Sequence, residues 1–245
     1  MKLSAWIVLA CLIELWAGCT SSPVSQNATS QSATAPPANT SGAVKQSLGT
    51  AFGEERSSPV VDVTFVRNNP NEPAGVEIIR YDSAAGVKKL AKEHAEYSSP
   101  PGTGLVTVQI LNNANRPYPT VSRNGWNYVI GEPGARYQIV ITNQTHRRIE
   151  IVASVDGLDV TDGAPASYQK RGYVLAPGEV YAIDGFRTSQ NSVAAFRFSS
   201  VEGSYANQKY GLTANVGVIG VAVFTEKGAR ILNSDGTVNP FPGNS

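Results

Sequence analysis

The chain has 245 residues, of which 20 are Lys or Arg and 19 are Asp or Glu, so its formal net charge is +1. This balance argues against a general nucleic-acid-binding protein, which usually carries a basic excess or a clustered basic face. Only two cysteines and two histidines are present, which all but excludes structural zinc sites, haem attachment and disulfide frameworks. No cofactor is expected. The 23 glycines, 15 prolines and 10 tyrosines, together with short apolar runs, indicate a turn-rich, mainly β protein.

The first 18 residues have the pattern of an export signal. Lys2 precedes an apolar stretch at residues 3–15, which is too short for a hydrocarbon core that needs about 20 residues but suits a signal peptide. The stretch leads to two small residues and Cys19, a sequence that resembles a bacterial lipobox, in which the cysteine is acylated and becomes the first residue of the mature protein. Trp16 and Glu14 depart from the usual form of that motif.

Lipidation at Cys19 predicts a membrane-anchored protein of the bacterial cell envelope. Two or three acyl chains anchor more firmly than one, at about 0.8 kcal/mol per buried CH₂. Thr20, rather than Asp, follows the cysteine, and by resemblance to bacterial sorting rules this favours the outer membrane, facing the periplasm or the cell surface. Lipidation at Cys11, a cleaved secretory signal and an uncleaved anchor remain alternatives.

The rest of the chain divides by composition. Residues 19–56 are rich in Ser, Thr, Ala and Pro and predict a disordered tether, because they cannot bury enough apolar surface to offset the entropy of ordering. Residues 57–232 predict a mainly β domain, with a strand–helix extension at 57–101 and a β core at 102–232. Residues 233–245 predict a flexible tail.

The extension contains two predicted strands and one helix. Residues 60–66 and 76–81 have strand composition, and Ser83 is placed to cap a helix that ends near Glu96. A Pro-rich break at residues 98–102 predicts a boundary. Whether the extension adds a strand to the main sheet stays open, although a segment this short with one helix buries too little to fold alone, which favours a single domain.

Regular strand signals follow from residue 105 onward. Residues 137–142 and 149–155 alternate apolar and polar side chains around a polar break, which predicts a hairpin. Residues 216–224 are apolar on both faces and contain two glycines, which predicts a central strand approached closely by a neighbouring layer. The series of short strands and turns predicts an antiparallel β-sandwich or barrel-like domain with one short N-terminal helix.

The sequence lacks the common catalytic motifs. It contains no Gly-x-Ser-x-Gly, His-Glu-x-x-His or phosphate-binding loop, and no catalytic residue is predicted. Paired carboxylates could still hydrolyse glycosidic bonds. Sequence position pairs none of the candidates, which are Asp156, Asp159, Asp162, Glu179 and Asp184.

Three carboxylates recur at three-residue intervals, at Asp156, Asp159 and Asp162. Oxygen-rich loops of this kind can bind calcium, but Asp156-Gly157 is also a favoured pair of residues in tight hairpin turns. Because the spacing differs from the alternating pattern of an EF-hand, the sequence favours turn residues over a metal site, and no metal ligand is predicted.

Residues 126–226, about two fifths of the chain, contain an ordered series of motifs. They are Ser154-Val155-Asp156-Gly157-Leu158-Asp159-Val160, Gly172-Tyr173-Val174-Leu175, Asp184-Gly185-Phe186-Arg187, Ala194-Ala195-Phe196-Arg197-Phe198, Ser204-Tyr205-Ala206 and Asn215-Val216-Gly217-Val218-Ile219-Gly220. In this series the chain resembles a family of uncharacterised bacterial exported proteins and lipoproteins. The resemblance implies a shared domain and transfers no activity, ligand or catalytic residue. Asp184 and Arg187 are candidate binding residues, because an Arg beside a turn could pair with a carboxylate at the edge of the core or meet a partner.

Two functions follow from these observations. The first is a membrane-tethered β domain that binds a protein or another envelope component without catalysis, since Tyr and Arg are enriched at recognition surfaces. The second is a carboxylate-based enzyme or carbohydrate-processing module that acts on envelope glycans. A cleft with two carboxylates between aromatic walls would favour the second.

Overall fold

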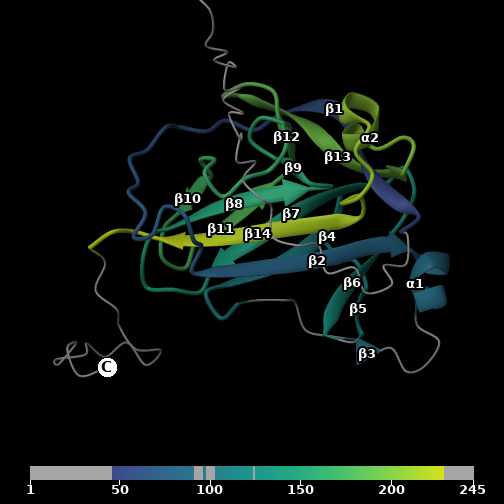
Figure 1. The fold of residues 1–245 in the computed structure, drawn as a ribbon, viewed down its shortest axis with the longest axis horizontal. Coiled ribbons are helices and arrows are strands. Elements are labelled where there is room, and N and C mark those ends of the chain that lie inside the picture. Colours follow the sequence, from purple (N-terminus) through teal and green to yellow (C-terminus); the bar gives the residue numbers. More distant parts are fainter. Residues whose placement is uncertain (1–45, 91–95, 98–102, 124, 229–245) are drawn as a thin grey trace, which may run out of the picture. The chain divides into compact units, whose positions relative to one another are not determined.

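The computed structural model describes residues 46–90, 96–97, 103–123 and 125–228, and these contain 14 strands and two short helices (Figure 1). The predicted signal peptide, the lipidation site Cys19 and the predicted tail from residue 233 lie outside the described residues. Within the described part, no helix is long and apolar enough to cross a membrane.

The first sheet has six strands, all antiparallel. In its middle, β7 (Arg136–Asn143) pairs along one edge with β4 (Val106–Asn112). Along its other edge it pairs first with β11 (Val180–Ile183) and then with β13 (Ser192–Ser200). In turn, β13 pairs with β12 (Gly185–Arg187) and with β1 (Leu48–Ser57).

The second sheet has eight strands, with β14 (Val218–Thr225) between β8 (Ile149–Val155) and β2 (Gly75–Ser83). Beyond β2 follow β6 (Trp126–Gly131), which runs parallel to it, β5 (Thr120–Arg123) and β3 (Glu96–Tyr97). At the other edge, β10 (Tyr173–Leu175) pairs with β8, and β9 (Leu158–Asp159) also pairs with β8. The helices are α1 (Ala84–Leu90) and α2 (Tyr205–Tyr210). The fold is mainly β and sandwich-like, which confirms the predicted fold class.

The core forms from alternate side chains of the facing strands. Tyr137, Ile139 and Ile141 of β7 are at most 3% exposed. The rings of Phe196 and Phe198 stack on Tyr137, with centroid distances of 5.2 and 4.4 Å. Aromatic side chains supply much of the area buried in such a core, so this stack is a major contact along the middle of the first sheet.

The predicted central strand is confirmed in β14, which has a partner strand on both sides. Its Val221 and Val223 are at most 1% exposed. At Gly220 a Cβ atom would lie 2.8 Å from the Ser154 hydroxyl of β8, so the glycine makes room for a neighbour in its own sheet rather than for another layer.

The tether prediction is wrong at its C-terminal end, because residues 48–57 form β1 along the edge of β13. Leu48 is 3% exposed and Thr50 is fully buried. Most residues of β1 are small or polar, so its sequence has little of the apolar periodicity by which a strand is recognised. Its burial comes from the sheet that it joins.

The predicted hairpin of residues 137–142 and 149–155 is also wrong, because β7 and β8 belong to different sheets. Asn143 stabilises the crossing between them. Its Nδ2 donates to the backbone oxygens of Arg147 at 2.7 Å and of Ala176 at 2.8 Å, and its Oδ1 accepts from the backbone N of Thr145 at 2.9 Å. A hairpin and an arch between two sheets both place alternate apolar residues toward the core, so the sequence pattern does not distinguish them.

Residues 58–74, here called the strap, do not contain the predicted strand at 60–66. The strap leaves the first sheet where the Val60 N donates to the Gln190 oxygen at 2.9 Å. It joins the end of β14 where the Lys227 N donates to the Val66 oxygen at 2.7 Å. The valine pattern of a strand is present, but the segment between these two bonds forms no ladder with a neighbouring strand in the described part of the chain.

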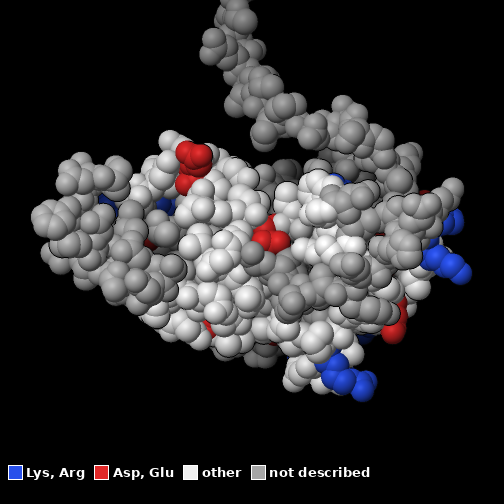
Figure 2. Space-filling view, turned by 90° about the horizontal axis from the view of Figure 1, so that it is seen from below, with Lys and Arg blue, Asp and Glu red and all other residues white. Residues whose placement is uncertain are grey.

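The strap also concentrates exposed apolar side chains. Val61, Val63 and Val66 are 83%, 42% and 55% exposed. On the face of the molecule shown in Figure 2, charged side chains are scattered over a largely uncharged surface.

The extension at 57–101 belongs to the same domain, because β2 pairs with β14 and β6 inside the second sheet. The predicted helix is present as α1. It starts after Ser83, whose hydroxyl accepts from the Gly86 N at 3.1 Å, and α1 is described as far as Leu90. Glu96, its predicted end, lies in β3 instead. The predicted boundary at 98–102 lies outside the described residues.

Candidate functional site

Asp156 and Gly157 form a two-residue turn between β8 and β9. Both have positive φ, +56° and +80°, as a type I′ turn requires, and Val155 pairs with Leu158 across the turn. The carboxylate of Asp156 is directed into the interior, where the residue is 2% exposed.

Neutral donors hold that carboxylate. Its Oδ2 accepts from the Thr50 N at 2.7 Å, and its Oδ1 accepts from the Gly217 N at 2.9 Å and from the Tyr81 hydroxyl. The Thr50 Oγ1 lies 2.7 Å from the Tyr81 hydroxyl and 2.6 Å from that of Tyr137. Burial raises the pKa of Asp156 to about 6, although the hydrogen bonds oppose this effect. The network joins β1, β2, β7 and the turn, so its role is to hold the sheets together.

The other two carboxylates of the 156–162 loop have separate partners. Asp159 is fully buried, and its Oδ1 accepts from the Thr161 N at 2.8 Å. Burial raises the pKa of Asp159. Asp162 is paired with Lys170, with 2.7 Å between Oδ1 and Nζ. In the part of the chain that the structure describes, no group of three or more His, Cys, Asp or Glu side chains could hold a metal ion.

Asp184 directly precedes β12 and Arg187 is its last residue, but the two side chains line different cavities. Arg187 holds the start of the strap: its Nη1 donates to the Ser58 oxygen at 2.8 Å, and its Nε donates to the Tyr173 hydroxyl at 3.2 Å. Asp184 lines a small polar pocket. The structure therefore does not bring these two sequence candidates into one site.

A groove of about 1190 Å³ lies beside the strap, and we call it the strap groove. Val61, Val63 and Phe65 of the strap line one side, while Tyr173 of β10 and Tyr181 of β11 line another. The two tyrosine rings are 4.9 Å apart. The volume exceeds the range of about 300–1000 Å³ that is usual for small-molecule pockets, so the groove suits a segment of a larger partner.

Three stretches of backbone beside the strap groove have at least one edge with no neighbouring strand among the residues that the structure describes. β10 is the edge strand of the second sheet and β11 is an edge strand of the first, and each pairs on one side only. Residues 61–65 of the strap make no backbone–backbone hydrogen bond with any described residue. Unpaired strand edges are templates for the addition of another extended chain.

Arg67 attaches the strap to the outer face of the second sheet. Its Nε lies 2.6 Å from Oε2 of Glu150, and the two side chains are only 10% and 8% exposed. The guanidinium also donates to the backbone oxygens of Tyr168 and Lys170, and it lies 3.7 Å from the centroid of the Phe224 ring. This buried ion pair is well supplied with hydrogen bonds, as such a pair must be to persist.

The charges that line the strap groove are mainly positive. They come from five cationic and three anionic side chains, which are Arg67, Lys170, Arg171, Arg187 and Lys227, and Asp62, Glu150 and Glu179. The Arg67–Glu150 pair cancels internally, and Lys170 is paired with Asp162 outside the lining, which leaves three cations against two anions. Arg171 is 79% exposed and reaches Asp62 only at 4.0 Å, so its charge is available to a partner.

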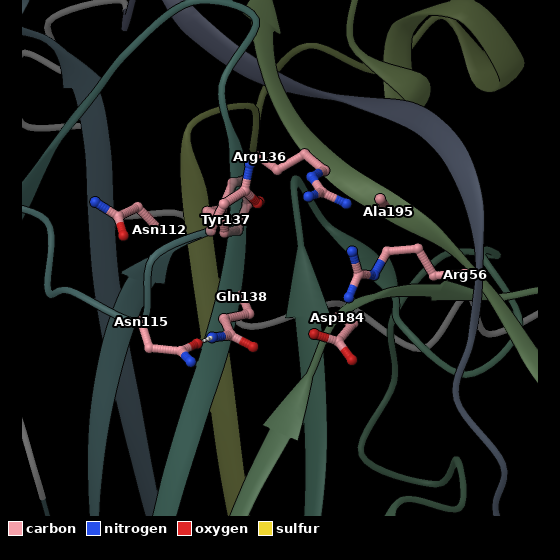
Figure 3. A pocket seen from close by; sticks show the side chains of 9 residues that line it. Arg56, Asn112, Asn115, Arg136, Tyr137, Gln138, Asp184 and Ala195 are labelled. Carbon is pink, nitrogen blue, oxygen red and sulfur yellow. Dashed lines mark hydrogen bonds between the residues drawn. The ribbon is translucent and has the colours of Figure 1, made fainter.

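A second pocket, of about 70 Å³, lies where the first sheet branches between β7, β11, β12 and β13 (Figure 3). The side chains of Arg56 and Asp184 point into the same space. Arg136 and Gln138 of β7 also line it, and Gln138 donates to the Asn115 Oδ1 at 2.7 Å. We call this cavity the branch pocket.

The sequence predicted neither cavity, and of the residues that line them it singled out only Asp184, Arg187 and Glu179. One signal for the strap groove was present: the valine run at 60–66 ends in a loop rich in Asn and Pro and has no obvious partner run. No comparable signal marked Arg56, Arg67 or Glu150.

No family model, curated protein or solved structure matches this chain. Membership of residues 126–226 in a family of bacterial exported proteins therefore stays a prediction, and the function is inferred from the geometry of the cavities.

Proposed function

We propose that this protein is a lipid-anchored binding module of the bacterial envelope, and that its β domain holds an extended segment of a partner protein in the strap groove without catalysis. The observation that carries the proposal is the meeting of two unpaired strand edges, β10 and β11, with an unpaired strap around one groove.

The mode of binding follows from these edges. An extended segment that enters the groove can form main-chain hydrogen bonds with β10, β11 or residues 61–65 of the strap, as in other cases of strand addition. Val61 and Val63 of the strap and the rings of Tyr173 and Tyr181 offer apolar contacts to its side chains. The surplus of cations favours a segment that carries Asp or Glu.

The catalytic alternative, an enzyme acting on envelope glycans, needs two carboxylates that face a substrate across a cleft. The three carboxylates that line the strap groove already have partners. Glu150 is paired with Arg67, Glu179 accepts from the Ala176 N at 2.6 Å, and Asp62 accepts from Gln190 at 3.2 Å. This arrangement favours binding over hydrolysis.

Photo-crosslinking in the native envelope tests the groove. A benzoylphenylalanine at Val61 should capture a partner, whereas the same group at Leu212, which is 44% exposed and lies outside the groove lining, should not. A crosslinked product that protease digestion removes supports a protein partner. A product that contains amino sugars, or equal capture from both positions, contradicts the proposal.

Charge reversal tests the preferred partner chemistry. Arg171→Glu together with Lys227→Glu should reduce capture from Val61, because an acidic segment would then meet like charges. Arg116→Glu changes an exposed charge outside the groove lining and serves as the control. Capture that increases in the double variant would reject an acidic partner.

The anchor is tested separately. Cys19→Ser should release the protein from membranes or leave an unprocessed precursor, because the thiol that would carry the acyl chains is lost. Fractionation of cells followed by mass measurement gives the readout. A variant that stays membrane-bound at mature size would show that Cys19 is not the lipidated residue.

A further inference from the structure

The branch pocket is positioned by an irregularity in β1. The pairing of β1 with β13 shifts register between Phe52 and Glu55, as in a β-bulge. Before the shift Thr50 faces the core, and within it Glu54 forms ion pairs with Arg136 and Arg197 of the first sheet. Bulges re-aim side chains and are frequent next to functional sites. Here the bulge brings Glu54 and Arg56, two residues apart, to the same face.

A close backbone approach keeps the bulge in place. A Cβ atom at Gly53 would lie 2.5 Å from the backbone oxygen of Ala195, which lines the branch pocket. No side chain larger than that of glycine fits there without displacing the backbone of β13. The close packing of the β1 and β13 backbones therefore fixes the position of Arg56 relative to the pocket.

Two side chains of opposite charge line the pocket without forming an ion pair with each other. Glu54 lies 3.0 Å from Arg136 and 2.8 Å from Arg197, so the two guanidinium groups share one carboxylate, which offsets one of their two positive charges. Neither Arg56 nor Asp184 forms an ion pair within 4.0 Å with any residue that the structure describes, although both point into the same space (Figure 3). Among its lining residues the small polar pocket thus contains one cation, Arg56, and one anion, Asp184, that take part in no ion pair with a described residue.

We propose that the branch pocket binds the zwitterionic group of an α-amino acid. Arg56 would bind its carboxylate by charge-assisted hydrogen bonds, and Asp184 would accept from its ammonium group. The Gln138 amide and the nearby Asn112 side chain supply further polar contacts. A ligand that carries both charges pairs with both Arg56 and Asp184, whereas an anion or a cation alone leaves one of these two side chains unpaired.

The size of the cavity agrees with this ligand. Its 70 Å³ has room for several water molecules, each of which needs about 10–15 Å³ by the same measure. That space accommodates the amino and carboxyl groups of one amino acid, and because Arg56 is exposed, a longer side chain can extend into solvent. The zwitterion can therefore belong to a free amino acid or to an amino acid joined through its side chain to a larger molecule.

Isothermal titration calorimetry on the detergent-solubilised full chain tests the proposal. Glycine represents the free amino acid, and Nε-acetyl-lysine represents one that is joined through its side chain. Saturable binding of at least one of them is expected, with acetate and methylamine weaker by at least about tenfold, since each lacks one of the two charges. No saturable binding of either amino acid, or acetate binding as tightly as glycine, would overturn the proposal.

Two variants assign the binding to the pocket. Arg56→Gln and Asp184→Asn keep similar side-chain sizes and should each weaken binding by about tenfold or more. Arg171→Gln, in the strap groove, is the control and should leave binding unchanged. Equal affinity in all four proteins would place the binding elsewhere and reject the assignment. This result is independent of the crosslinking result at Val61, so the two proposals can fail separately.

Discussion

Asp156 and Glu150 lie near opposite ends of β8, and both are buried, but different kinds of partner hold them. Asp156 lies between the sheets and accepts hydrogen bonds from the neutral groups of Thr50, Gly217 and Tyr81. Glu150 lies on the outer face of the second sheet, where Arg67 of the strap covers it.

The difference lies in how each charge is compensated. Neutral donors compensate the Asp156 charge only in part, so burial raises the pKa of Asp156 to about 6 and the carboxyl titrates near neutral pH. Glu150 is matched by a cation, but each member of that pair is costly to bury without the other. The interior network can thus respond to pH, whereas the buried charge on the outer face depends on its ion pair with Arg67 of the strap.

The largest expected effect comes from breaking that ion pair. Glu150→Ala leaves the Arg67 charge buried without its carboxylate and should lower the free energy of unfolding by about 3–5 kcal/mol in urea denaturation. Glu226→Ala is the matched control. It removes an ion pair with Arg148 whose side chains are 26% and 43% exposed, and it should cost about 0–1 kcal/mol.

A double replacement sharpens the interpretation. Arg67→Met combined with Glu150→Leu removes both charges and should recover most of the lost stability, because no buried charge is left unpaired. Equal losses in Glu150→Ala and Glu226→Ala would show that the buried pair contributes no more than an exposed one.

The next effect is a pH dependence at Asp156. The folded-state pKa of about 6 lies above the ordinary value of 3.8, so the folded protein holds the proton more tightly than the unfolded chain does. The contribution of Asp156 to the free energy of unfolding therefore increases as pH falls from about 6 toward 3.8. The total increase is about 2–3 kcal/mol, at 1.36 kcal/mol per pKa unit.

The measurement compares the wild type with Asp156→Asn, which cannot titrate. Between pH 7 and pH 4 the wild type should gain about 2–3 kcal/mol relative to the variant in the free energy of unfolding. The variant is expected to be less stable at every pH, since an amide replaces one acceptor with a donor, and only the difference in pH dependence is informative. Parallel pH curves would show that the pKa of Asp156 is not raised.

A smaller effect is expected from the turn that carries Asp156. Gly157→Val places a β-branched residue at a φ of +80°, with its Cβ 3.0 Å from the Asn215 side chain, and should cost about 1–3 kcal/mol. Gly178→Val is the control. Gly178 also has positive φ, +70°, but a Cβ there would meet nothing within 4 Å. The substitution at position 178 therefore adds backbone strain without steric crowding. A larger loss at position 178 would contradict the crowding argument.

The smallest expected effect is that of calcium. Because Asp156, Asp159 and Asp162 have separate partners, added calcium should leave the melting temperature unchanged. A bound ion would instead stabilise the fold by about 2.7 kcal/mol at one hundred times its Kd. A melting temperature that rises by several degrees with millimolar calcium and falls again with chelator would show that the loop rearranges into a metal site.

Strands and turns that are marked by the residues of the segment itself could be predicted from the sequence. The strands β2, β4, β6, β7, β8 and β14 follow apolar runs, because burial on one or both faces sets the side-chain pattern of a strand. The Asp156–Gly157 turn follows from residues that tolerate positive φ. The central place of β14 follows from its apolar character on both faces.

Tertiary structure alone decided which strands pair and which surfaces remain open. Thr50 and Asp156 are 106 residues apart in the chain, so neither predicts the other, and the small polar strand β1 gains its burial from β13. The strap groove and the branch pocket arise for the same reason. Arg67 meets Glu150, and Arg56 faces Asp184, only after two sheets and a β-bulge have brought distant segments together.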